Sequence, residues 1–252
     1  MIRLASGSPR RRELLALLGA PFEVVPADVD ERAAPHPALA KAEAVARPGD
    51  VTLAADTMID LDGESIGKPA DAADAVAMLS RLAGRTHVVR TEVALIGASG
   101  RSLLLGVSST VTMRPADEQA IRAYVATGEP LDRAGAYAIQ GGGGALVASY
   151  AGCYANIVGL PLCHTFFALR KMGVAMPERP EPAFSRAFGF VCPAWRIAYA
   201  QGRQLRRCLL LVEYVEWPVA DRAALQVRVG GSDAEVGADD DRLDPGRSLL
   251  WP

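Results

Sequence analysis

The chain has 252 residues, half of them apolar, and a formal net charge of −2. This length allows one large domain or two small ones, and the near-neutral charge excludes a global field for nucleic acid or an anionic membrane. No apolar run approaches the roughly 20 residues of a membrane helix, and the N-terminus lacks a signal-type apolar stretch. We therefore expect a cytoplasmic protein with neither membrane nor nucleic acid among its partners.

The N-terminal stretch predicts a phosphate-binding turn. Ile2–Ser6 has the pattern of a short buried strand, and Pro9 suits the first turn of a helix over Arg10–Leu18 that Gly19 ends. Backbone N–H groups at a helix start attract anions, and guanidinium forks grip phosphate oxygens two at a time. A solvated basic helix start is the alternative, which this stretch alone leaves equally open.

Strands and helices alternate as far as residue 82. In chain order the predicted elements are strand Phe22–Val25, a loop over Ala27–Pro37, helix Ala38–Ala46, strand Val51–Asp56, a hairpin over Met58–Ile66 and a helix from Asp71 to Leu82. Asp56 is expected near the C-terminal end of its strand, where open α/β sheets bind ligands. Lys41 and Lys68 are two of only three lysines in an arginine-rich chain, which indicates sites that need a compact ammonium.

The second half begins with a predicted antiparallel hairpin of Thr86–Ile96 and Ser102–Met113. Helix Pro115–Thr127, strand Ala145–Tyr150 and helix Leu160–Met172 follow. The four glycines Gly141–Gly144 indicate either a flexible link or a close approach of the backbone. Three prolines within 177–182 predict a linker, and 183–252 is expected to be a C-terminal extension of unknown structure that carries no motif.

Charged and polar residues recur at the predicted turns and helix starts. Cations outnumber acids among them, with Arg10, Arg11, Lys41 and Lys68 against Glu31 and Asp56. This balance suits a polyphosphate, with a divalent metal held by the carboxylates and a carboxylate that orients or deprotonates water. Each residue taken alone is more simply explained as part of a surface salt bridge.

Residues 1–176 resemble the Maf family of nucleoside triphosphate pyrophosphatases. The resemblance rests on collinear segments that stand here as Ala5–Leu15, Asp28–Glu31, Lys41–Ala46, Ala54–Thr57, Gly67–Pro69, Gly128–Gly141 and Asn156–Leu162. It implies an α/β fold of the inosine-triphosphatase-like type, in which a long mixed β-sheet is flanked by helices and a cleft lies between two lobes. Members are usually dimeric and hydrolyse a nucleoside triphosphate to the monophosphate and pyrophosphate with Mg²⁺ or Mn²⁺.

The resemblance also implies a role for each matched residue. Asp56 is the implied proton acceptor, with Lys41 and Lys68 as its catalytic companions at the phosphates. Ser6, Arg10 and Arg11 are the implied phosphate-binding residues, and Glu31 with Asp56 is the implied metal site. The chain departs from the family pattern between Glu31 and Lys41, where the segment is short and holds two prolines.

Three positions that the family associates with base choice are Arg10, Thr57 and Gln140 here. This set resembles the branch that acts on dTTP and UTP, and a glutamine amide offers the donor and acceptor that thymine and uracil require. Hydrolysis of dTTP and UTP, with modified pyrimidine triphosphates as further house-cleaning substrates, is therefore the leading interpretation. The alternatives are a catalytically weak nucleotide-binding protein acting in septum inhibition, and a pyrophosphatase shifted to 7-methyl-GTP or inosine triphosphate.

Overall fold

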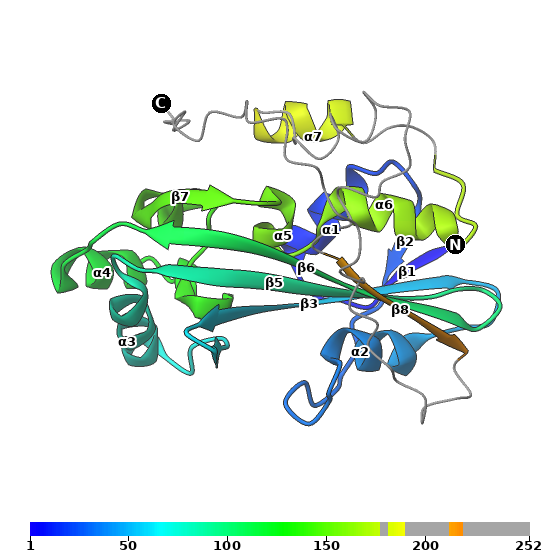
Figure 1. Ribbon diagram of the computed structural model, residues 1–252, viewed down its shortest axis with the longest axis horizontal. Coiled ribbons are helices and arrows are strands. Elements are labelled where there is room, and N and C mark those ends of the chain that lie inside the picture. The colour runs from blue at the N-terminus through cyan, green and yellow to red at the C-terminus, as the bar shows by residue number, and fades with distance from the viewer. Residues whose placement is uncertain (177–180, 190–211, 219–252) are drawn as a thin grey trace, which may run out of the picture.

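A computed structural model describes residues 1–176, 181–189 and 212–218. One mixed sheet runs the length of this part, with helices on both of its faces (Figure 1). Its strands are β1 (Ile2–Leu4), β2 (Phe22–Val24), β3 (Val51–Leu61), β4 (Glu64–Ile66), β5 (Thr86–Ile96), β6 (Arg101–Met113), β7 (Val147–Ala151) and β8 (Val212–Pro218). The predicted class, a long mixed sheet with flanking helices, is confirmed.

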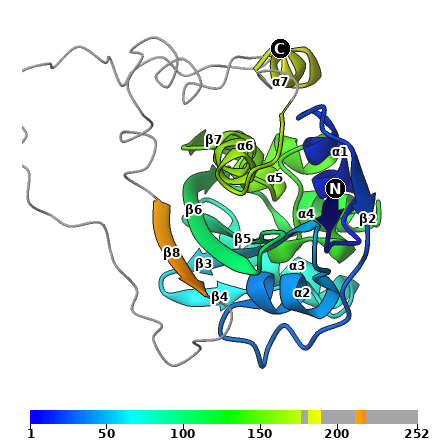
Figure 2. The same ribbon diagram turned by 90° about the vertical axis from the view of Figure 1, so that its right-hand side faces the viewer.

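The strand order is β2-β1-β3-β5-β6-β7, with β4 paired to β3 and β8 paired to β6. β1 runs parallel to β2 and β3, whereas β3, β5, β6 and β7 pair antiparallel in sequence. The helices are α1 (Pro9–Ala16), α2 (Pro37–Val45), α3 (Ala72–Leu82), α4 (Glu118–Val125), α5 (Tyr154–Val158), α6 (Leu162–Lys171) and α7 (Glu181–Phe188). Helices α1, α5 and α6 lie on one face of the sheet and α2 on the other (Figure 2). No helix among these residues has the length and apolarity needed to cross a membrane.

Strand β3 is longer than its sequence predicts. The expectation that Asp56 lies near the end of its strand is wrong, because β3 continues to Leu61 along its antiparallel partner β5. The parallel partner β1, however, pairs only as far as Leu53. Asp56 therefore lies beyond the end of β1, on the stretch of β3 that precedes the pairing with β4 at Ile59. The end of β3 was therefore predicted wrongly, whereas Asp56 does lie past the end of the neighbouring strand β1.

The apolar residues form separate clusters toward the two ends of the sheet. One joins β1 and α1 to α6 and contains Leu4, Leu14 and Leu169. A second joins α3 and α4 to the far half of β3 and contains Leu79 and Ile121. A third, smaller cluster packs α2 against the sheet and contains Ala38, Ala42 and Ala94. The first two clusters are the cores of two lobes that share the long strands.

Two pieces of the C-terminal extension lie among the described residues. Phe184 of α7 is 1% exposed and belongs to the core cluster of β1 and α6, and its neighbour Phe188 contacts the ring of Tyr154. β8 pairs along the first half of β6. The rest of the extension and residues 177–180 of the predicted linker lie outside the described residues, so the boundary at 176 stays a prediction.

The glycine run is a place of close backbone approach. Gly141–Leu146 forms a 3₁₀ helix, and a Cβ placed on Gly143 would overlap the Ala138 carbonyl oxygen and the Tyr124 hydroxyl. Only glycine fits between these groups. The run therefore fixes the short segment from Ala138 to Gln140, which leads into the 3₁₀ helix.

Buried His87 makes folding stability depend on pH. Its Nε2 lies 2.8 Å from the Tyr137 hydroxyl, and burial lowers its pKa from 6.5 to about 4. In the unfolded chain His87 binds a proton below about pH 6.5, whereas in the folded chain it does so only below about pH 4. The free energy of unfolding therefore falls as the pH drops through this window. We expect this residue to account for about 2–3 kcal/mol of the loss between pH 7 and 4.5. Urea unfolding at both pH values checks this against His87→Gln, and equal losses in the two proteins would contradict it.

Candidate active site

A cleft of about 1090 Å³ lies between the two lobes. It is lined from one side by the turn after β1 and by α2, and from the other by the segments around Lys68 and Gln140. Every residue predicted for the site lines this cleft, namely Ser6, Arg10, Arg11, Glu31, Lys41, Asp56, Thr57, Lys68 and Gln140. The fold thus brings together side chains that are up to 134 positions apart in the sequence.

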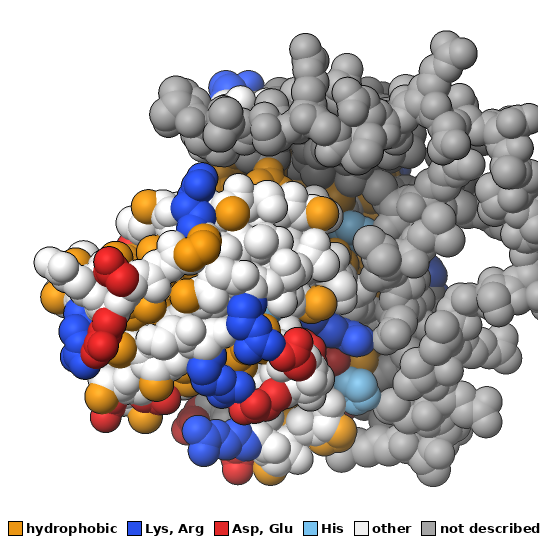
Figure 3. All heavy atoms as spheres, turned by 60° about the vertical axis from the view of Figure 1, so that its left-hand side comes forward, with side chains coloured by type: hydrophobic (Ala, Val, Ile, Leu, Met, Phe, Trp, Pro, Cys, Tyr) orange, Lys and Arg blue, Asp and Glu red, His pale blue; other side chains and the backbone are white. Residues whose placement is uncertain are grey.

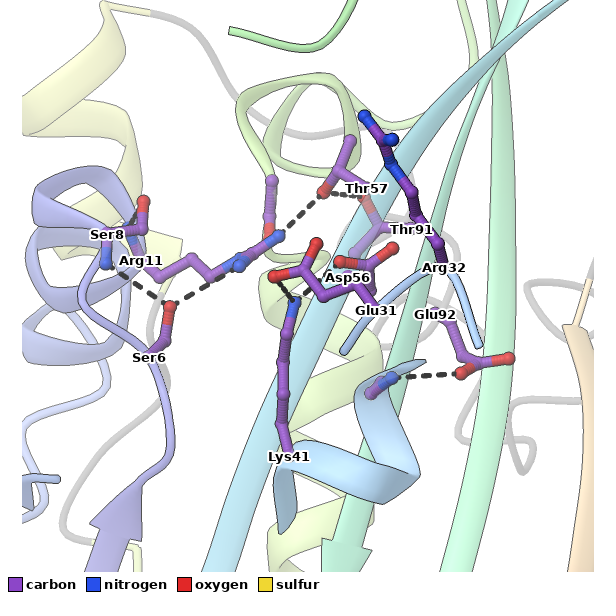
Figure 4. A network of polar contacts seen from close by, with 12 residues as sticks. Ser6, Ser8, Arg11, Glu31, Arg32, Lys41, Asp56, Thr57, Thr91 and Glu92 are labelled. Atoms are coloured by element: carbon purple, nitrogen blue, oxygen red, sulfur yellow. Dashed lines mark hydrogen bonds and ion pairs between the residues drawn. The ribbon is translucent and has the colours of Figure 1, made fainter. Parts of the chain in front are cut away.

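Lys41 joins two carboxylates at the centre of the cleft (Figure 4). Its Nζ lies 2.7 Å from Asp56 Oδ1 and 2.8 Å from Glu31 Oε1, and its side chain is 8% exposed. The short, proline-containing segment between Glu31 and Lys41 therefore still places both residues at Asp56. Oδ2 of Asp56 makes no hydrogen bond within the described part of the chain, which leaves it available to accept a proton from water.

Helix α2, which carries Lys41, is anchored by a residue that the sequence did not reveal. The side chain of its N-cap residue, His36, makes no capping hydrogen bond. Glu92 of β5 caps the helix instead. Glu92 Oε1 accepts from the Ala38 backbone N–H at 3.3 Å, and Oε2 lies 2.9 Å from His36 Nδ1. Glu92 is also the cross-strand partner of Asp56. Glu92 is the one acidic residue of the predicted strand Thr86–Ile96, and this was the only sequence signal for its role.

Glu92→Ala removes this cap. We expect it to lower the free energy of unfolding by about 1 kcal/mol, the usual cost of losing a helix cap. Glu92→Gln keeps an oxygen that accepts from Ala38, so its loss should be smaller. Urea denaturation at pH 7 measures both, and an alanine variant as stable as the glutamine variant would contradict the capping role.

Arg11 lies at the other wall of the cleft and is fixed by three hydrogen bonds. Its Nε donates to the Gly159 carbonyl at 3.0 Å, Nη1 to Ser6 Oγ at 3.3 Å and Nη2 to Thr57 Oγ1 at 3.1 Å. A guanidinium has five N–H groups, so one remains on each terminal nitrogen. Burial lowers the pKa of Arg11 while nearby Asp56 opposes this shift, and the group stays cationic.

Ser6 is held as a donor toward the cleft. Its Oγ already accepts from the Ser8 backbone N–H and from Arg11 Nη1, both at 3.3 Å. A hydroxyl has two acceptor positions and one proton. Because both acceptor positions are used, the Ser6 proton is left for an acceptor such as a phosphate oxygen.

Arg10, Lys68 and Gln140 are less constrained. Arg10 Nη1 lies 3.6 Å from the exposed carboxylate of Asp132, and burial lowers the pKa of its guanidinium more than Asp132 raises it. Lys68 forms no ion pair with any described residue, and the Gln140 amide makes no hydrogen bond with one. Lys68 is therefore a cation in the cleft without a protein counter-ion among these residues.

On the face in Figure 3, basic and acidic side chains lie next to one another rather than in single-sign fields.

The fold and the cleft define an α/β protein with a cation-rich site that suits a polyphosphate. The family model described as Maf-like protein matches residues 1–172, and the chain belongs to this family.

Curated relatives cover most of the same region. The chain is 49% identical over 188 residues to a dTTP/UTP pyrophosphatase of Anaeromyxobacter dehalogenans (strain 2CP-1 / ATCC BAA-258), a match that covers 70% of this chain and 97% of the relative. It is 48% identical over 192 residues to a dTTP/UTP pyrophosphatase of Myxococcus xanthus, covering 71% and 96%. A nucleoside-triphosphatase / dITP/XTP pyrophosphatase structure from Mycobacterium abscessus aligns at 18% identity with a TM-score of 0.37, covering 68% of this chain and 96% of that one. That likeness is too distant to bear on function.

Proposed function

We propose that this protein is a nucleoside triphosphate pyrophosphatase that hydrolyses dTTP and UTP to the monophosphate and pyrophosphate. The observation that carries the proposal is the cleft, where Lys41 contacts Asp56 and where Arg11 and Lys68 line the same space. Relatives that share 45–49% of their residues with this chain bear the name dTTP/UTP pyrophosphatase. Modified pyrimidine triphosphates are further substrates within the proposal, in keeping with a house-cleaning enzyme.

Asp56 is the proposed proton acceptor. Lys41 donates to Oδ1 and fixes the carboxylate, while Oδ2 is left to take a proton from the attacking water. Ser6 donates to a phosphate oxygen, Arg11 offers its two remaining N–H groups, and Lys68 supplies an unpaired positive charge. These cations stabilise the negative charge that builds on the leaving pyrophosphate.

Mg²⁺ or Mn²⁺ is the proposed cofactor, with Glu31 and Asp56 as protein ligands. Both carboxylates contact one ammonium, so they converge on a position where a cation is stabilised. No cluster of three or more histidine, cysteine or acidic side chains suited to a metal occurs in the described ranges. The pair fits magnesium, which is commonly bound through one or two carboxylates together with substrate phosphates. When bound, the metal would neutralise charge on the phosphate oxygens.

Arg10, Thr57 and Gln140 are the proposed residues of base choice. The Gln140 amide has no hydrogen-bond partner among the described residues and lines the cleft, so both its donor and its acceptor are available. This pairing matches the N3–H and the carbonyl edge of thymine and uracil.

A panel of triphosphates tests the proposal in one experiment. The protein with Mg²⁺ or Mn²⁺ is incubated with dTTP, UTP, 7-methyl-GTP and ITP, and products are separated by chromatography. We expect dTMP and UMP with one pyrophosphate each. Release of inorganic phosphate would contradict the bond that is cleaved, preference for 7-methyl-GTP would support the shifted enzyme, and binding in calorimetry without products would support the non-catalytic alternative.

The proposal includes a cytoplasmic homodimer with no nucleic-acid or membrane partner. Light scattering coupled to size exclusion measures the oligomeric state directly, and a monomeric mass at micromolar concentration would contradict the dimer.

A further inference from the structure

A buried polar chain lies behind Arg11 and ends at Asn156. Thr91 of β5 and Asn156 of α5 are both 0% exposed, and two hydrogen bonds join them. The Thr91 backbone N–H donates to Asn156 Oδ1 at 3.1 Å, and the Thr91 hydroxyl donates to the Asn156 carbonyl at 2.9 Å. The Thr91 hydroxyl also lies 2.9 Å from the Thr57 hydroxyl, which accepts from Arg11 (Figure 4).

The single proton of each hydroxyl gives this chain a direction. Thr91 uses its proton on the Asn156 carbonyl, so toward Thr57 it can only accept. Thr57 must therefore donate inward to Thr91. Toward Arg11 the Thr57 oxygen can therefore act only as an acceptor, and it accepts from Arg11 Nη2. Every proton in the chain points away from the cleft and toward Asn156.

Further hydrogen bonds hold the Asn156 side chain in place. Its Nδ2 donates to the Val89 carbonyl and to Ser109 Oγ, both at 2.9 Å. Ser109 in turn donates to the Cys153 carbonyl at 3.1 Å and accepts from the Cys153 N–H at 2.9 Å. Each donor and acceptor in these contacts is buried and has a partner. A fully satisfied buried network of this kind favours one fixed arrangement of its side chains. The same segment also supplies the Gly159 carbonyl that accepts from Arg11 Nε.

We propose that Asn156 and Thr91 are positioning residues for Arg11, acting through Thr57. They hold the Thr57 hydroxyl as an acceptor, which pins Arg11 Nη2 and aims the two remaining guanidinium N–H groups at the triphosphate. The inference rests on the proposed function and adds residues that do not contact the substrate. It also means that Thr57 can accept a hydrogen bond from the substrate but cannot donate one, because its only proton is donated to Thr91.

Thr91→Val tests the proposal because valine has a similar shape without the hydroxyl. With dTTP we expect kcat/KM to fall about tenfold, the scale of one lost hydrogen bond, whereas Thr91→Ser should stay within about twofold. Thr52→Val is the matched control. Thr52 is a 0% exposed threonine of the same sheet whose hydroxyl has no partner among the described residues, so its loss should leave kcat/KM unchanged. Thr91→Ala also removes the hydroxyl and serves if Thr91→Val does not fold.

A double-mutant cycle separates positioning from a purely structural role. In the Thr57→Val background, Thr91→Val should cause no further loss of kcat/KM, because its effect passes through the Thr57 hydroxyl. Additive losses, or a Thr91→Val enzyme with wild-type kcat/KM, would overturn the inference. If the wild-type protein hydrolyses no triphosphate, the proposed function fails instead. Calorimetric binding of inorganic triphosphate by the same variants then decides the positioning role, with about tenfold weaker binding by Thr91→Val expected and unchanged binding against it.

Discussion

Asp56→Asn is expected to lower kcat for dTTP at least about a hundredfold, the scale on which enzymes lose a general base. Asparagine has the same shape, and its amide oxygen can still accept from Lys41 in place of Oδ1. What it loses is the basic oxygen Oδ2, which has no protein partner among the described residues and is the proposed acceptor of the proton from water. The change should therefore affect kcat far more than KM.

Asp60→Asn is the control for this variant. Asp60 lies on the same strand, four residues further along, and its Oδ1 accepts from the Gly63 N–H, which an asparagine can also do. It does not line the cleft, so its kcat should equal that of the wild type. Steady-state assays of pyrophosphate release measure both proteins. Turnover within a few-fold of wild type in Asp56→Asn would remove Asp56 from the role of proton acceptor.

Arg11→Lys should be nearly as damaging, with kcat/KM for dTTP reduced roughly a hundredfold. The fork of Arg11 makes three hydrogen bonds to Gly159, Ser6 and Thr57 and keeps two N–H groups for the substrate. A lysine ammonium has three donors and no planar fork, so it cannot satisfy these partners and hold two phosphate oxygens as well. Two lost charge-assisted hydrogen bonds correspond to about 3 kcal/mol, and so to roughly that factor.

Arg12→Lys provides the comparison at the neighbouring position. Arg12 is exposed on α1, and its side chain makes no hydrogen bond or ion pair with any described residue. The substitution keeps the charge, as Arg11→Lys does, but changes no contact in the cleft. Equal kinetics for the two variants would show that only the charge at the helix start matters and that the fixed geometry of Arg11 does not.

Much of the architecture could be predicted because it depends on local patterns. Two segments rich in β-forming residues on either side of Gly97–Arg101 predicted the β5–β6 hairpin, and Asp71 and Asp117 precede helices whose N-terminal N–H groups they cap. The length of β3 was missed for the opposite reason. Its continuation past Asp56 depends on β5, where the paired residues lie 28 to 34 positions further along the sequence, from Asp60 with Val88 to Thr57 with Thr91.

The sequence by itself determined which chemical groups the cleft contains. The sequence shows arginines at a helix start, an isolated Asp56 after an apolar run, and the rare lysines Lys41 and Lys68. These groups can be identified without a structure because residue type and local position already limit their chemistry. The tertiary structure alone decided how these groups are held. Glu92 caps a helix that begins 55 positions earlier, and Asn156 orients Thr91 across 65 positions. No local pattern specifies such partners, since a hydrogen bond depends on distance and direction in space, which only the packed sheet and helices determine.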